Sequence, residues 1–128
     1  MGIDIGQAHW AYGSFHRFRT RLAEAEGFDL DQMEGFQRPI GECARNSWTN
    51  DAGEDITILR PFLDHSDCDG ELSWQECEQV VDRLAEILNE WAKASESEFD
   101  HDVYECRVLV AEMRACIETK EALEFWCN

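Results

Sequence analysis

The sequence predicts a mainly α-helical protein that forms a single small helical domain over residues 1–128. Apolar residues recur at spacings of three and four in several long segments, which places them on one face of a helix. Turn-forming residues separate these segments, and we expect loops at 37–54 and 94–98. A hydrophobic content of 44% in 128 residues is enough for a core, so the chain is not a disordered acidic tail.

The first predicted helix follows an irregular aromatic segment at residues 9–13. Ser14 suits its N-cap position and Gly27 its end. One face of this helix is apolar, with Phe15, Phe18, Leu22 and Ala25. The rest of its circumference carries a basic cluster made of His16, Arg17, Arg19 and Arg21. We expect this cluster to pair with the acidic half of the same chain; anion binding is the alternative.

The middle of the chain is predicted to hold shorter elements. We expect a second short helix within residues 28–36, and Trp48 is expected to anchor the loop that follows it. Pro61 lacks a backbone donor, so the helix ahead of residue 65 is expected to be short and to start near Arg60.

The best-defined predicted helix starts after residue 73. Its apolar stripe consists of Trp74, Cys77, Val81, Leu84, Leu88 and Trp91. The other face carries an acidic row that is expected to face solvent, namely Glu78, Asp82, Glu86 and Glu90. A last long helix, capped by Asp100 or Asp102, is predicted to turn Cys106, Leu109, Val110, Met113 and Ile117 inward. The apolar end of the chain, with Leu123, Phe125 and Trp126, is expected to fold back on the core.

The formal net charge of −17 is unevenly distributed. Residues 61–128 carry 18 acidic and 5 basic side chains, a net charge of −13, whereas residues 1–60 carry a net charge of −4. Such a surface repels nucleic acids and anionic membranes. It favours cations or a basic partner protein.

Six cysteines, at positions 43, 68, 77, 106, 116 and 127, are expected to remain reduced. The first residues lack the basic and apolar regions of a signal peptide, so we expect a cytoplasmic protein. Cys77, Cys106 and Cys116 fall on predicted apolar helix faces, where a thiol behaves as a small hydrophobic group. No nucleophile motif, phosphate-binding loop or paired catalytic set is found in the sequence, which argues against an enzyme.

A twelve-residue segment from His65 to Glu76 combines acidic residues with a central glycine. Asp67, Asp69 and Glu76 place carboxylates at its third, fifth and twelfth positions. Gly70 at the sixth position permits a sharp backbone turn. Carboxylates that alternate around a tight turn converge on one point, as a cation site requires.

This segment resembles the calcium loop of the EF-hand family, and the resemblance extends over residues 65 to about 84. It implies one EF-hand-like helix-loop-helix unit at about 56–92 that binds Ca²⁺. The implied ligands are His65, Asp67, Asp69, the Glu71 carbonyl, Ser73 and Glu76. EF-hands usually occur in pairs joined by short strands. No second intact loop is found in the sequence, so we expect a monomer supported by the flanking helices or a homodimer.

His65 is the departure from the family pattern, because the first loop position normally holds Asp. An imidazole removes one negative charge and offers nitrogen where Ca²⁺ prefers oxygen. Zn²⁺ is therefore the runner-up, bound by His65, Cys68 and Cys77 with a fourth ligand such as Cys43. A third interpretation leaves the loop without metal, with Ser73 and Glu76 forming a capping box.

Three runs, at 15–19, 64–72 and 123–125, also resemble small, acidic, uncharacterised actinobacterial proteins. This resemblance brings no activity with it. The sequence therefore supports two hypotheses for the function. The first is a non-enzymatic binding protein whose single divalent-cation site stabilises or switches the fold. The second is an inhibitor of a basic partner protein, of the toxin-immunity or phage anti-defence type, that uses an acidic, aromatic-rich surface.

Overall fold

The computed structural model describes residues 2–36, 46–66, 70–95 and 98–127. Its elements in chain order are β1 Gly2–Ile5, β2 Ala8–Ala11, α1 Tyr12–Ala25, the 3₁₀ turn η1 Leu30–Gln32, α2 Arg60–Leu63, β3 Glu71–Leu72, α3 Trp74–Ala94, α4 His101–Thr119 and β4 Leu123–Cys127. Within this described part, no helix is both long and apolar enough to cross a membrane.

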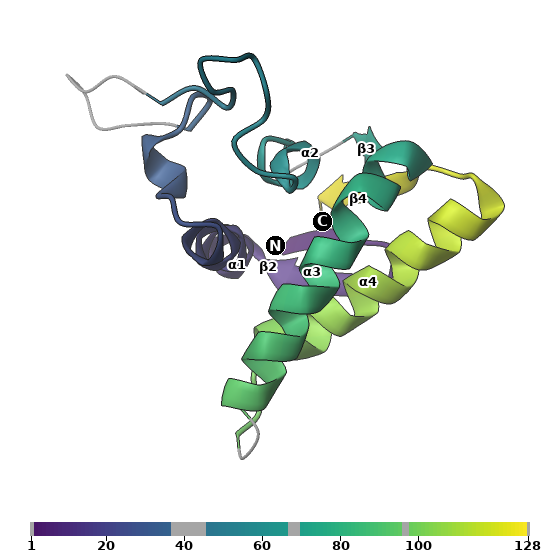
Figure 1. The fold of residues 1–128 in the computed structure, drawn as a ribbon. Coiled ribbons are helices and arrows are strands. Elements are labelled where there is room, and N and C mark those ends of the chain that lie inside the picture. The colour runs from purple at the N-terminus through teal and green to yellow at the C-terminus, as the bar shows by residue number, and fades with distance from the viewer. Residues whose placement is uncertain (1, 37–45, 67–69, 96–97, 128) are drawn as a thin grey trace.

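The prediction of a mainly α-helical protein is wrong. Four strands form one antiparallel sheet in the order β2-β1-β4-β3, so the fold is mixed α and β. The N-terminal and C-terminal strands are neighbours in this sheet, which brings the two ends of the chain side by side (Figure 1). Helices α3 and α4 pack along each other as a hairpin beside the sheet (Figure 1). In the same view, α1 lies on the side of α3 that is away from α4.

The strands were missed because each is too short to show a clear pattern. In β1 and β2, Ile3, Ile5, Ala8 and Trp10 are buried, whereas His9 is exposed. This is the alternation of a half-buried strand, but it extends over only four residues on each side of a two-residue turn. Gly6 in that turn has a φ of +59°, which few other residues adopt without strain.

The C-terminal segment does fold back on the core, as expected, and it does so as a strand. Leu123 and Phe125 are buried, whereas Glu124 and Trp126 are exposed. β4 pairs with β1 on one edge and with β3 on the other. A strand of the same chain thus pairs with β3 where a second loop pairs with the first in EF-hands.

The predictions of the individual helices differ in accuracy. The first one begins three residues earlier than expected, at Tyr12, so that Ser14 lies inside α1 and Ala11 occupies its N-cap. Of the short helix expected within 28–36, only η1 forms. Trp48 is buried and donates from Nε1 to the Glu34 carbonyl at 2.9 Å, which confirms it as a loop anchor. The rest of that predicted loop, 37–45, lies outside the described residues.

The two long helices are confirmed. α3 begins with the Ser73–Glu76 capping box, and α4 with Asp100, whose carboxylate accepts from the amides of Asp102 and Val103. The helix ahead of the loop is a single turn with Pro61 at its start. The predicted unit at 56–92 is therefore a loop followed by one long helix, without the long entering helix of an EF-hand.

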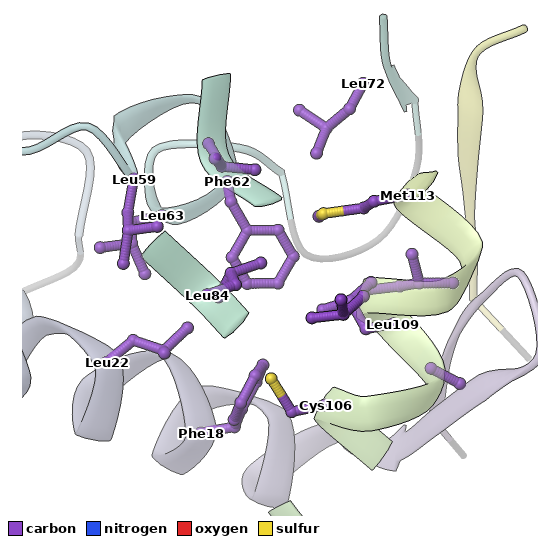
Figure 2. Close-up of a cluster of buried hydrophobic side chains, with 14 of the residues drawn as sticks. Phe18, Leu22, Leu59, Phe62, Leu63, Leu72, Leu84, Cys106, Leu109 and Met113 are labelled. Carbon is purple, nitrogen blue, oxygen red and sulfur yellow. The ribbon is translucent and has the colours of Figure 1, made fainter. Parts of the chain in front are cut away.

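One hydrophobic core joins all these elements. Figure 2 shows Phe18 and Leu22 of α1, Phe62 of α2, and Leu109 and Met113 of α4 around a common centre. Trp10 from β2 stacks on Phe18, with ring centroids 4.5 Å apart. The core therefore holds α1 and α2 against the α3–α4 hairpin and the sheet.

Arg19 is the charged side chain at the junction between α1 and α2. It is 3% exposed, and its Nη1 donates to the carbonyl of His65 at 2.7 Å and to those of Leu63 and Phe62 at 3.3 and 3.4 Å. These carbonyls lie at the end of α2, where a helix leaves acceptors unsatisfied and where the helix dipole favours a cation. Arg19 thus fixes α2, and the start of the 65–76 loop, to α1.

We predict that Arg19→Leu lowers the free energy of unfolding by about 2–4 kcal/mol, because buried carbonyls would lose their donor. Arg17→Leu is the matched control, since Arg17 is exposed and donates to Ser14 Oγ at 3.0 Å; its expected change is within about 0.5 kcal/mol. Urea denaturation measures both. Equal effects of the two substitutions would show that the Arg19 contacts do not stabilise the fold.

Candidate functional site

The structure describes four of the six predicted metal ligands. His65, Glu71, Ser73 and Glu76 have described positions, whereas Asp67 and Asp69 lie outside the described residues. Two of the zinc candidates, Cys68 and Cys43, also lie outside them. The fit of a metal can therefore be judged on the two ends of the loop.

His65 is engaged by the protein on both of its ring nitrogens. Nδ1 lies 2.8 Å from the Ser66 carbonyl, and Nε2 lies 2.9 Å from the Glu71 carbonyl. The ring also stacks on Phe125 of β4, with centroids 4.2 Å apart. A carbonyl oxygen only accepts, so the doubly protonated imidazolium can donate to both partners, whereas a neutral ring can donate to one.

The Glu71 carbonyl is the backbone oxygen that an EF-hand loop would offer to calcium at its seventh position. Here it faces the imidazole of His65 instead. The β3–β4 pairing and a hydrogen bond from the Phe125 amide to the Gly70 carbonyl, at 3.0 Å, hold this part of the loop against β4. The Glu71 carbonyl is therefore already in contact with a protein group at this end of the loop.

Ser73 and Glu76 form the reciprocal capping box. The Glu76 amide donates to Ser73 Oγ at 3.1 Å, and the Ser73 amide donates to Glu76 Oε1 at 2.9 Å. These two bonds satisfy donors at the start of α3 that have no partner within the helix. The geometry matches the capping role of Glu76 and draws its carboxylate toward the helix.

The described loop residues do not offer a converging set of cation ligands. Among the described residues, no group of three or more His, Cys, Asp or Glu side chains is placed to hold a metal ion. Cys77, a zinc candidate, lies fully buried in the core, and burial raises the pKa of its thiol to about 12. Cys77 therefore packs among apolar side chains, where it acts as a small hydrophobic group.

A cleft of about 430 Å³ lies beside the loop. It is lined by His16, Arg19, Asp31, Gly35, Phe36, Asp64, His65 and Ser66. Within it, Nε2 of His16 lies 3.1 Å from Oδ1 of Asp31, a pairing that sequence analysis did not anticipate. Histidine, arginine and carboxylate side chains meet here without a dominant sign of charge, so the cleft favours neither a simple anion nor a simple cation.

Residues of the runs 15–19, 64–72 and 123–125 contact one another beside this cleft, although the third run does not line it. His16 and Arg19 come from the first run, His65 from the second, and Phe125, which stacks on His65, from the third. The Arg19–His65 bond and this stacking contact make the three runs one packing unit. The contacts between the three runs are therefore explained by the packing of the fold and do not require a bound ligand.

The remaining basic residues of α1 include Arg21, which pairs with the acidic half as expected. Its guanidinium contacts Asp100 at 3.0 Å and Asp102 at 3.1 Å, and it lies over the ring of Trp91. The hydrogen bond from Arg21 lowers the pKa of Asp100. These contacts tie α1 to the N-terminus of α4.

The cysteines depart in part from the sequence expectation. Cys77, Cys106 and Cys116 are free thiols. Cys127 is disulfide-bonded, so the expectation that all thiols are reduced is wrong for this residue. Its partner is not among the other described cysteines.

Two surface features complete the candidate sites. The acidic row of α3 is exposed at all four positions, as predicted. Phe99 and Tyr104, near the start of α4, are 79% and 54% exposed and were not singled out from the sequence. The available signal was a second apolar stripe on the last helix, at positions 104, 108, 111 and 115, beside the inward stripe.

Comparison with known proteins adds no relative: no protein family, curated protein or solved structure was found to match this chain.

The sequence predicts calcium binding, whereas the contacts of His65 favour a loop without metal, and substitution of His65 distinguishes the two. We expect the wild-type protein to melt at the same temperature in 1 mM calcium and in EDTA, because His65 engages the Glu71 carbonyl. His65→Asp should restore the first carboxylate and free that carbonyl. A dissociation constant of about 10⁻⁵ M would then stabilise the variant by about 2.7 kcal/mol in 1 mM calcium.

His65→Asn is the matched control, because it removes the imidazole without adding a charge. It should respond to calcium less than His65→Asp does. A calcium-dependent rise in the wild-type melting temperature as large as that of His65→Asp would show that the histidine does not exclude the cation.

Proposed function

We propose that this chain is a non-enzymatic binding protein that associates with a basic partner protein, in the manner of an inhibitor that covers the partner's surface. The observation that carries the proposal is the exposed acidic row of α3. The side chains of Asp82 and Glu86 are 87% and 67% exposed. Their contacts with Arg114 and Arg83 are 3.7 Å long, so these arginines neutralise the row only weakly.

The distribution of charge supports the same proposal. α3 and α4 both belong to the half of the chain that carries a net charge of −13. Arg21 uses its charge on Asp100 and Asp102, away from the row. A negative field of this kind attracts a basic protein and accelerates association with it.

The chemistry of the described side chains favours binding over catalysis. The thiols of Cys77 and Cys106 are buried, and burial raises the pKa of each to about 12, which disfavours the nucleophilic thiolate. The disulfide at Cys127 is typical of an oxidising environment and argues against the cytoplasmic location expected from the sequence.

We predict that replacing Asp82, Glu86 and Glu90 by Lys abolishes capture of a basic protein from the native host at low salt, while the fold, measured by circular dichroism, is unchanged. Wild-type capture should weaken as salt is added. The control replaces three exposed acidic residues elsewhere, Glu24, Asp51 and Glu54, by Lys, so that the net charge changes equally. An equal loss of capture in both triple variants would show that the acidic row acts only through the overall charge of the protein and is not a specific binding surface.

A further inference from the structure

Helix α4 is apolar on two faces. Its inner face packs in the core with Val103, Cys106, Leu109, Val110 and Met113. A second apolar stripe, made of Tyr104, Val108, Ala111 and Ala115, follows the spacing 4–3–4 along the outer side. A surface helix normally carries polar residues opposite its core face. Here Val108 packs partly against the core, whereas Tyr104, Ala111 and Ala115 are exposed apolar residues.

The outer stripe lines a hollow of about 510 Å³. Its floor is formed by Val108, Ala111 and Ala115. One wall is the β1–β2 turn, where the Gln7 amide donates to Glu112 Oε1 at 3.0 Å and fixes the turn against α4. Small alanine side chains between firm walls allow the backbone of another element to approach closely. We call this surface the α4 groove.

The groove continues toward the start of α4. A second hollow, of about 320 Å³, shares Tyr104 and Arg107 with the first and extends to Phe99. The rings of Phe99 and Tyr104 lie 6.2 Å apart, and both are exposed. Large aromatic side chains at the end of an apolar groove are typical anchors of protein interfaces.

Charge identifies the occupant. A second copy of the chain would bring another net charge of −17 against the first, which opposes self-association. Glu112 lines the first hollow and Glu98 and Asp100 line the second, so that these carboxylates outnumber the one cationic lining residue, Arg107. The acidic row lies on the neighbouring helix α3. The stripe from 104 to 115 is about 16 Å long at 1.5 Å per residue, the length of three helical turns.

We propose that the α4 groove receives a basic amphipathic helix of the partner protein, with apolar residues at spacings of three and four in the groove and lysine or arginine side chains toward the surrounding carboxylates. This inference rests on the proposed function and deepens it, because it names the surface and the segment of the partner. The acidic row steers the partner, and the α4 groove holds it.

The test uses a synthetic 18-residue peptide of leucine and lysine, with its leucines on one helix face, labelled for fluorescence anisotropy. A scrambled peptide of the same composition is the control for charge. The wild-type protein should bind the amphipathic peptide at least tenfold more tightly than the scrambled one. The peptide should shift the amide NMR signals of residues 104–115.

Ala111→Glu should weaken binding of the amphipathic peptide at least tenfold by blocking the groove floor. Ala25→Glu, on the exposed end of α1, adds the same charge far along the chain and should leave binding unchanged. Phe99→Ser tests the anchor without touching the groove floor and should weaken binding at least threefold. Circular dichroism of each variant checks the fold.

Equal binding of the two peptides, or equal binding by Ala111→Glu and Ala25→Glu, would overturn the inference. If charge reversal of the acidic row still weakened the binding of both peptides in that case, the proposed function would hold but the α4 groove would not be the binding surface. If charge reversal had no effect on either peptide, the proposed function would fail as well. A concentration-dependent dimer that Ala111→Glu abolishes would assign the groove to a second copy and overturn the choice of occupant.

Discussion

The guanidinium of Arg19 is the contact on which the arrangement of the other elements depends. It is buried between α1 and α2 and donates to the carbonyls of Phe62, Leu63 and His65. The ring of Phe15 lies 4.8 Å from its central carbon, which adds a cation–π contact. α2 has only one turn and cannot fix its own direction. The direction in which the chain enters the 65–76 loop is therefore set by a side chain that lies 46 positions earlier than His65.

Beyond the Arg19 contact, other protein groups hold the two described ends of the 65–76 loop. His65 bridges the Ser66 and Glu71 carbonyls and stacks on Phe125, and β3 pairs with β4. The capping box then starts α3. The segment whose sequence resembles an EF-hand loop is thus contacted at its described ends by an imidazole, a neighbouring strand and a helix cap. The binding surface that we propose combines the exposed acidic row of α3 with the exposed rings of Phe99 and Tyr104 near the start of α4.

Sequence reasoning succeeded where a pattern extended over many residues. The stripe from Trp74 to Trp91 and the cap at Asp100 are local features, and both long helices followed from them. The sheet was missed because its four strands are two to five residues long and pair across the whole chain, as Ile5 does with Phe125. The loop motif was found, but the partners of His65 depend on β4, and Arg19 contacts α2 only in the folded chain. Neither contact leaves a periodic signal in the sequence.

The central claim is that contacts within the protein, and not a bound cation, hold the loop against β4. Amide hydrogen exchange of the Phe125 amide, which donates to the Gly70 carbonyl, tests it most directly. In EDTA, this amide should exchange only through global unfolding, with the same opening free energy as buried amides in the middle of α3, and calcium should not change it. Rapid exchange of the Phe125 amide in EDTA, slowed to the rate of the α3 core by calcium, would contradict the account.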